Sequence, residues 1–137
     1  MELHRGRLLD HLHLHARDLE ASKRFYRAAL GVLGIPLVEE DDYLSADELW
    51  IDQGEPATAV HFAFQAKDRA QVDAWHAAVL AAGGRDNGAP GERPYHPGYY
   101  AAFALDPDGN NVEAVHHGPA ERSAESVVVS FEGPPGG

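Results

Sequence analysis

Near its N-terminus the chain alternates polar and apolar residues and then changes to a helical pattern. The stretch HLHLHA (residues 11–16) places its histidines on one face of a strand and its leucines on the other. Asp18 follows in the position of a helix N-cap. Apolar residues then recur at helical spacing, at Leu19, Phe25, Tyr26, Ala29 and Leu30. The pattern predicts a strand and an amphipathic helix that ends at Gly31 or Gly34.

The same pattern returns 50 residues later. HLHLHARDLEASKRFYRAALGVLG (residues 11–34) aligns without a gap with HFAFQAKDRAQVDAWHAAVLAAGG (residues 61–84), so that His11 meets His61 and Asp18 meets Asp68. The apolar positions of the second helix are Val72, Trp75, Val79 and Leu80, and Gly83-Gly84 ends it. The chain is therefore predicted to contain a duplicated module.

Short strands are predicted after each helix. They are IPLVEE, DYLSA and ELWIDQ in the first copy, and YYAAFALD and NNVEAVHH in the second, after a glycine- and proline-rich loop at residues 87–97. The predicted fold is α+β, with the order βαβββ twice. We expect one domain at residues 1–118, with modules at about 7–54 and 59–118. The tail, residues 119–137, contains one β-like run, SVVVSF, and a GPPGG end that we expect to fray.

Composition narrows the classes of function. The 137 residues carry a formal net charge of −11, which argues against a nucleic-acid or anionic-membrane partner. The absence of cysteine excludes disulfides, thiolate metal sites and a cysteine nucleophile. No signal peptide and no apolar run of about 18 residues is visible, so we expect a cytoplasmic protein.

Three residues are candidate metal ligands. If the leucine and phenylalanine faces of the two first strands pack on the helices, the opposite faces carry His11 and His61. Glu113 is a carboxylate in an otherwise apolar strand, and a buried charge needs a partner. Two imidazoles and a carboxylate suit Fe, Mn, Zn, Ni or Co and leave positions open for substrate. The alternative is two hydrogen-bonded structural histidines and a Glu113 paired with an arginine. His13 and His15 are interpreted as cavity lining, as partners of the ligands or as solvated residues.

Three segments resemble the vicinal oxygen chelate superfamily, which includes glyoxalase I, extradiol dioxygenases and bleomycin-resistance proteins. They are DHLHLHARDLEASKRFY, HFAFQAKDRAQVDAWHAAVLAAGG and AAFALDPDGNNVEAVHH. The resemblance implies two βαβββ modules that form a cupped, barrel-like mixed sheet around a cavity. It also implies a homodimer, with modules paired within one chain or between two. The family's ligand positions map to His11, His61 and Glu113, the last also as a catalytic residue.

The resemblance implies substrates with two adjacent oxygens that chelate the metal. Glyoxalase I takes a fourth ligand from the last strand of module one. When the closing glycines Gly54 and Gly118 are aligned, the position that matches Glu113 is Leu49, with Trp50 beside it. Glu48 and Asp52 would supply the fourth ligand only if the register slips. The predicted substrate pocket contains His13, Trp50, Tyr95, His96, Tyr99, Tyr100 and Phe103.

Three functions follow from these residues. The first is a small metal-dependent lyase or isomerase of glyoxalase type. The others are a dioxygenase and a non-enzymatic protein that sequesters a drug or metabolite, as bleomycin-resistance proteins do. In each, the partner is a small molecule, and the sequence leaves the substrate and the metal open.

Overall fold

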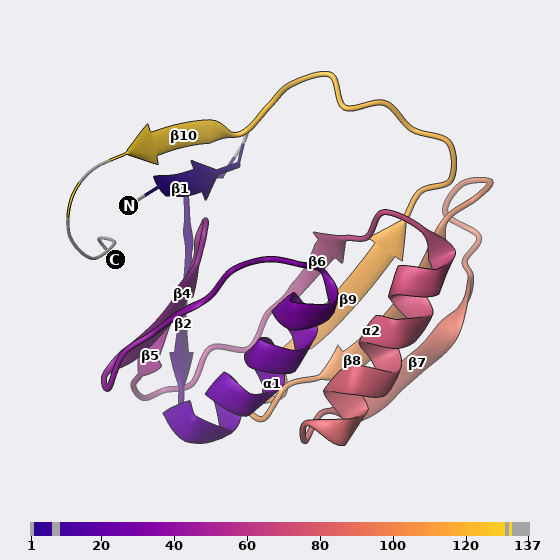
Figure 1. The fold of residues 1–137 in the computed structure, drawn as a ribbon. Helices are drawn as coiled ribbons and strands as arrows, with labels where there is room; N and C mark the ends of the chain where they lie inside the picture. The colour runs from indigo at the N-terminus through magenta and orange to yellow at the C-terminus, as the bar shows by residue number, and fades with distance from the viewer. Residues whose placement is uncertain (1, 7–8, 131, 133–137) are drawn as a thin grey trace.

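The computed structural model describes residues 2–6, 9–130 and 132 (Figure 1). The first module consists of β2 (Leu12–Ala16), α1 (Leu19–Val32), β3 (Val38–Glu39), β4 (Tyr43–Ala46) and β5 (Leu49–Gln53). The second consists of β6 (His61–Gln65), α2 (Arg69–Ala81), β7 (Arg85–Glu92), β8 (Tyr100–Leu105) and β9 (Asn111–His116). This order confirms the predicted α+β fold with two βαβββ modules.

Each module forms its own four-stranded mixed sheet with the same topology. The strand order is β2-β5-β4-β3 in the first sheet and β6-β9-β8-β7 in the second. In both, the strand before the helix pairs in parallel with the last strand of the module, and the other pairs are antiparallel. The duplication that the sequence predicts is therefore present in the strand ladders.

Both helices begin where the sequence predicts. Asp18 accepts a hydrogen bond from the backbone N–H of Ala21, and Asp68 accepts one from that of Gln71, so each aspartate caps its helix. Gly31 lies inside α1. The chain leaves the two helices through Gly34 and Gly83, whose φ angles of 73° and 99° favour glycine.

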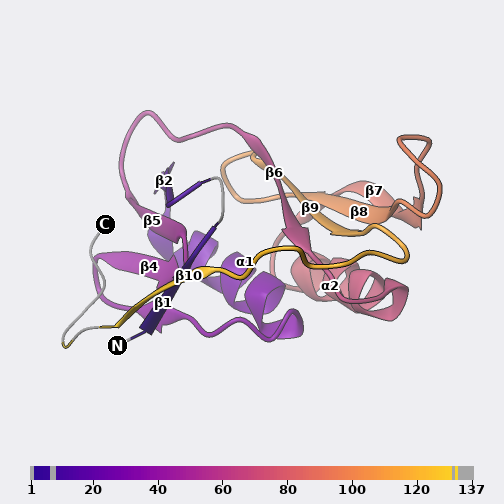
Figure 2. The same ribbon diagram turned by 90° about the horizontal axis from the view of Figure 1, so that it is seen from above.

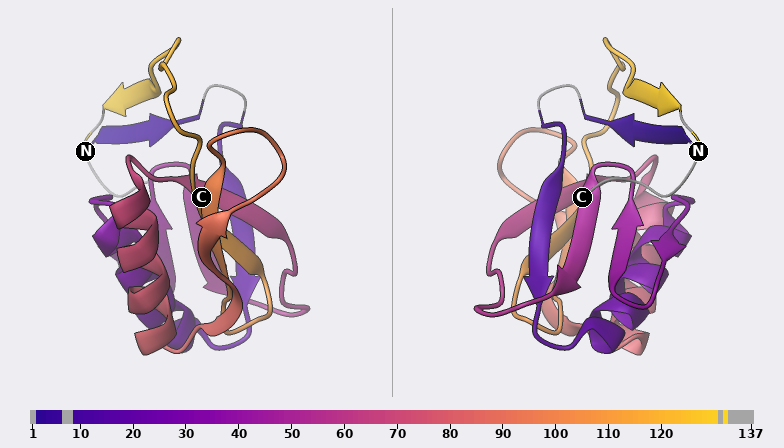
Figure 3. Two further views of the ribbon diagram at one scale, coloured as in Figure 1. Left: turned by 90° about the vertical axis from the view of Figure 1, so that its right-hand side faces the viewer. Right: turned by 90° about the vertical axis from the view of Figure 1, so that its left-hand side faces the viewer.

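A single hydrophobic core joins the two modules. Leu14 and Ile51 of the first sheet and Val112 of the second belong to the same buried cluster as Phe25 of α1 and Trp75 of α2. The two helices contact each other, and in both views of Figure 3 they lie together along one side of the strands. Figure 2 shows the two sheets spreading apart from this helix pair. The sheets share no hydrogen-bonded ladder in the described residues, so the expected barrel-like sheet does not close within one chain.

The turn at Asp106 ties the second module to the first helix. Its carboxylate is buried and accepts a hydrogen bond of 2.6 Å from the Tyr26 hydroxyl of α1. The same carboxylate accepts bonds from the backbone of Asp108 and from the backbone and side chain of Asn110. Burial and the neighbouring Asp106 raise the pKa of Tyr26, so its phenol stays protonated and keeps donating.

Two elements differ from the prediction. The glycine- and proline-rich loop expected from residue 87 begins as strand β7, which runs to Glu92 with register shifts around Gly88. β7 is an edge strand, and an edge tolerates a proline that cannot donate to the ladder. β1 (Glu2–Arg5) was not predicted; it pairs with β10 (Val127–Ser130), which lies within the predicted run SVVVSF. The predicted frayed end, residues 133–137, lies outside the described residues.

Candidate functional site

Each sheet has an outer face, the face turned away from the helices, and the second module's outer face contains a histidine–carboxylate pair. His61 begins β6, and Glu113 is central in the neighbouring β9. The His61 Nε2 atom lies 2.9 Å from Glu113 Oε1. Glu113 is 2% exposed, whereas the His61 side chain is 55% exposed. The pair therefore connects a buried carboxylate to the surface.

Tyr99 supports this pair from the same face. Its hydroxyl donates a hydrogen bond to Glu113 Oε2, the oxygen that does not face His61. Burial first, and then the hydrogen bond to Glu113, raise the pKa of Tyr99 well above its ordinary value. Phe103 lies beside His61, with ring centroids 6.0 Å apart, and belongs to a small apolar cluster on this face. The carboxylate is thus held by one imidazole and one phenol that keeps its proton.

The outer face of the first module carries a different group of donors. His13 and His15 of β2 and Asp52 of β5 offer ligand atoms that all lie within 4.8 Å of one another. His13 Nε2 is 2.8 Å from Asp52 Oδ1, and His15 Nε2 is 3.9 Å from the same oxygen. Within the described ranges, these three residues form the one such group of histidines and carboxylates.

His11 stands apart from the His61–Glu113 pair. It immediately precedes β2, its side chain is about half exposed, and its Nδ1 lies 2.9 Å from Asp10 Oδ1. In the described part of the chain, the predicted trio of His11, His61 and Glu113 does not form a group whose ligand atoms could hold one metal ion together. One chain thus brings together two of the three predicted ligands.

The strand ladders correct one assignment made from the sequence. Glu113 pairs with Ala63, and the residue 50 positions before Ala63 is His13. His13 pairs with Trp50, so Trp50 and not Leu49 is the structural counterpart of Glu113. Counting back from a glycine failed because Gly54 directly follows β5, whereas His117 lies between the end of β9 and Gly118. Trp50 stacks on Tyr43 with ring centroids 4.1 Å apart.

The pocket residues predicted in the second module lie on two different faces of the second sheet. Tyr95 is exposed and packs edge-on against Tyr99. His96 Nε2 lies 3.0 Å from His117 Nδ1, and the two rings stack beside Tyr99. Tyr100 lies on the helix side, where its hydroxyl donates to Asp73 of α2. The structure therefore gathers Tyr95, His96 and Tyr99 near Glu113 and turns Tyr100 away.

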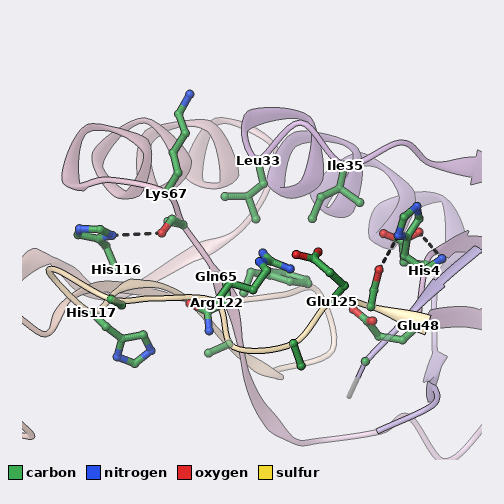
Figure 4. Close-up of a pocket in the computed structure, with 18 of the residues that line it drawn as sticks. His4, Leu33, Ile35, Glu48, Gln65, Lys67, His116, His117, Arg122 and Glu125 are labelled. Carbon is green, nitrogen blue, oxygen red and sulfur yellow. Dashed lines mark hydrogen bonds between the residues drawn. The ribbon is translucent and has the colours of Figure 1, made fainter. Parts of the chain in front are cut away.

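Figure 4 shows a separate pocket beneath the C-terminal tail. It has a volume of about 880 Å³, and its wall includes Leu33, Ile35, Gln65, Lys67 and Arg122. His116 lies at one end and His4 at the other (Figure 4). Burial raises the pKa of Glu48, which also lines this pocket. Neither His61 nor Glu113 is among the described residues of its wall, so this pocket is distinct from the His61–Glu113 pair.

Sequence reasoning gave His15 only as cavity lining, as a partner of the ligands or as a solvated residue, gave Asp52 as a ligand only if the register slips, and gave His117 no role. The signal for the first two was present, because alternate histidines in one strand share a face and Asp52 lies two residues beyond Trp50 on the neighbouring strand. The partnership of His96 with His117 depends on how the loop before β8 folds back. No spacing in the sequence indicates it.

Comparison with known proteins places the chain in a family. The model of the Glyoxalase/Bleomycin resistance protein/Dioxygenase superfamily matches residues 8–114. A search of curated proteins gives no match. No helix in the described residues is long and apolar enough to cross a membrane.

Solved structures agree with this assignment. A glyoxalase/bleomycin resistance protein from Albidiferax ferrireducens T118 is 36% identical over 77% of this chain and 95% of its own, with a TM-score of 0.66. A glyoxalase-related enzyme from Fulvimarina pelagi is 19% identical, covers 93% of this chain and 100% of its own, and has a TM-score of 0.68. A lactoylglutathione lyase from Agrobacterium tumefaciens is 23% identical over 80% of this chain and 93% of its own, with a TM-score of 0.58. Proteins of this superfamily usually bind a divalent metal and small-molecule substrates. The chain therefore belongs to the Glyoxalase/Bleomycin resistance protein/Dioxygenase superfamily.

Proposed function

We propose that this protein is a cytoplasmic, metal-dependent lyase or isomerase of glyoxalase type that acts on a small substrate with two adjacent oxygens. The proposed ligands are His11, His61 and Glu113, and Glu113 is also the proposed catalytic residue. The observation that carries the proposal is the His61–Glu113 pair, in which a 2% exposed carboxylate meets a half-exposed imidazole at 2.9 Å.

The donor set fits a divalent metal. A buried carboxylate is costly without a partner, and its partners here are the half-exposed His61 ring and the Tyr99 phenol. A divalent ion would compensate the negative charge more fully. Imidazole nitrogen and carboxylate oxygen are ligands that Fe, Mn, Zn, Ni and Co accept. The ion, when bound, stabilises negative charge that develops on the substrate oxygens.

The protein groups supply the proton chemistry in this proposal. The Glu113 carboxylate acts as a general base that takes a proton from a carbon bearing one of the two substrate oxygens. It then returns the proton to the adjacent carbon, which bears the other oxygen, and is a free carboxylate again. Tyr99 orients the carboxylate through Oε2, and its raised pKa keeps the phenol proton in place during this exchange. Phe103 beside His61 and Tyr95 edge-on against Tyr99 give the proposed site an aromatic lining.

We further propose that two chains build each site. The described part of one chain does not bring the His11 ring to the His61–Glu113 pair, and the two outer faces belong to separate sheets. A symmetric dimer would set the first module of one chain against the second module of its partner and complete two equal sites. The half-exposed side chains of His11 and His61 are then covered by the partner.

Metal content by elemental analysis tests the site. We expect bound metal in wild type and loss of most of the metal at this site in His61→Ala and Glu113→Gln. His76→Ala is the matched control, because the His76 ring also bonds a carboxylate, Asp86, but lies at α2 outside the site. Retention of the full metal content in both His61→Ala and Glu113→Gln contradicts the proposal.

Complementation tests whether the site spans two chains. His11→Ala and Glu113→Gln chains should each fail to complete a site, yet a mixture that exchanges subunits should regain about one site per heterodimer. No recovery after verified exchange would show that each site comes from one chain. Analytical ultracentrifugation gives the oligomeric state of each sample.

One observation favours a second function, sequestration of a flat ligand. Trp50 occupies the position of Glu113 in module one and stacks on Tyr43 at 4.1 Å, which provides an aromatic surface on the outer face. Quenching of Trp50 fluorescence by bleomycin in a Trp75→Phe background, without turnover, would support this function.

A further inference from the structure

We propose that His13, His15 and Asp52 form a second divalent-metal site on the outer face of the first module. The ligand atoms are the imidazole nitrogens of two histidines and an oxygen of one carboxylate, all within 4.8 Å of one another. This donor set lies within one chain and needs no partner. It is separate from the site proposed above, with which it shares no ligand.

The strand geometry brings the three donors together. His13 and His15 are alternate residues of β2, so their side chains leave the same face, and the rings meet edge-on with centroids 4.9 Å apart. Asp52 is directly opposite His15 in the parallel pairing of β2 with β5. Its Oδ1 atom lies 2.8 Å from His13 Nε2 and 3.9 Å from His15 Nε2. Both imidazoles thus turn a nitrogen toward the same oxygen.

The surroundings hold His15 and Asp52 in position. The backbone N–H of His15 donates to Thr58 Oγ1 at 2.7 Å, and the N–H of Thr58 donates back to the His15 carbonyl at 3.1 Å. The His15 ring lies against Gly54, where a Cβ atom would stand 3.0 Å from the ring. Trp50 Nε1 lies 3.5 Å from Asp52 Oδ2, the oxygen that faces away from the histidines. A site whose ligands are already oriented binds metal with less ordering cost.

A simple histidine–aspartate hydrogen bond does not account for the whole arrangement. His76 and Asp86 form such a bond at 2.9 Å, and in the described residues no further histidine or carboxylate joins them as a possible ligand. In the described residues, the His15 ring nitrogens have no hydrogen-bond partner, although Asp52 Oδ1 is near. A cation shared by the three groups uses both imidazoles and the carboxylate together.

The ligand chemistry indicates the class of ion. Two imidazoles and one carboxylate favour Zn(II), Ni(II), Co(II) or Cu(II) over Mg(II) or Ca(II), which prefer oxygen ligands. All three side chains are between about one third and one half exposed, so water can complete the coordination. His11 lies two residues before His13 and four before His15, which in an extended chain separates the Cα atoms by about 7 Å and about 13 Å. The two sites therefore bind different ions.

Equilibrium dialysis against Zn(II) and Ni(II) chloride, followed by elemental analysis, tests the second site in the full chain. Wild type should bind one more ion per chain than the His15→Gln/Asp52→Asn double variant. Each single variant should bind that ion at least about tenfold more weakly. Gly54→Ala removes no ligand but displaces the His15 ring, and we expect it to weaken the binding of the same ion. His76→Gln is the control and should bind as wild type does.

Variants of the two sites separate the two proposals. His61→Ala should lose only the first ion, and His15→Gln/Asp52→Asn only the second. If the double variant binds as many ions as wild type with unchanged affinity, the second site does not exist. If His61→Ala keeps the wild-type content while the double variant loses an ion, the second site stands and the proposed catalytic site fails. Circular dichroism of each variant confirms that the loss of metal does not come from unfolding.

Discussion

The two modules have the same fold, but their outer faces carry different chemistry. On the helix side, apolar residues recur at matching positions, such as Leu14 with Phe64 and Ile51 with Ala114. On the outer face, the 50-residue repeat matches His11 with His61, and the strand ladders match His13 with Ala63, His15 with Gln65, Trp50 with Glu113 and Asp52 with Val115. Only the first of these pairs is conserved between the modules.

This difference shows where the duplication is constrained. A strand residue that faces the helices loses packing in the shared core if its size or polarity changes, whereas its neighbour on the outer face lies outside that shared core. The helix sides of the two modules therefore stay alike. The histidine and carboxylate side chains can occupy different outer-face positions in the two modules while the fold stays the same. The first module carries its carboxylate at the end of β5, and the second carries it at the centre of β9.

The largest effect is expected when the shared core is broken. Phe25 and Trp75 are equivalent in the repeat, and both are fully buried. Phe25→Ala and Trp75→Ala should each lower the free energy of unfolding by about 3–5 kcal/mol, measured by urea denaturation. Unequal losses, with one variant near wild type, would show that the two modules do not contribute equally to the core.

Trp75→Phe introduces the residue of the first module into the second. We expect it to cost only about 1–2 kcal/mol, because the cavity is smaller and the indole N–H, which has no hydrogen-bond partner in the described residues, is removed. A loss as large as that of Trp75→Ala would mean that this core position requires the shape of the indole ring, and that burial of any aromatic ring is not enough.

A smaller effect is expected where the modules are joined. Tyr26→Phe removes the hydroxyl that donates from α1 to Asp106 and should cost about 1–2 kcal/mol in urea denaturation. The loss is limited because Asp108 and Asn110 still donate to the same carboxylate. Tyr43→Phe is the matched control, since its buried hydroxyl has no partner in the described residues and its removal should be nearly neutral. Equal effects of the two variants would contradict a role for the Tyr26–Asp106 bond.

The helix side was the predictable part of this molecule. Period-two and helical patterns gave β2, α1, β6 and α2, and the N-cap aspartates gave the start of each helix. These signals are local, because they depend on which face of a single element is apolar. β7 was missed because glycine and proline oppose a strand in general, and only its place at the sheet edge makes one acceptable.

The outer faces were less predictable because their contacts cross between strands. His61, from the repeat, and Glu113, from its place in an apolar strand, were predicted to share a metal site, and the structure brings the two side chains to 2.9 Å of each other. The grouping of His15 with Asp52 required the register of β2 on β5, which no local pattern gives. The count from the closing glycine also aligned β5 with β9 one residue wrong. Whether His11 joins His61 and Glu113 depends on how modules pair between chains, which no pattern within one chain determines.

The smallest effect concerns Tyr99 and appears only at high pH. The pKa of Tyr99 is raised by burial and by Glu113, so above about pH 10 the unfolded chain loses this proton while the native protein keeps it. Stability therefore falls as pH rises from about 10 toward the native pKa. Tyr99→Phe should flatten this part of the profile of unfolding free energy against pH, and Tyr95→Phe, which removes an exposed hydroxyl, is the control.

The first module has no phenol bonded to an outer-face carboxylate among its described residues, so Tyr43→Phe should leave a steeper slope than Tyr99→Phe does. If Tyr99→Phe keeps the wild-type slope, the phenol does not donate to Glu113 in solution, and the outer face of the second module is more open than the structure shows.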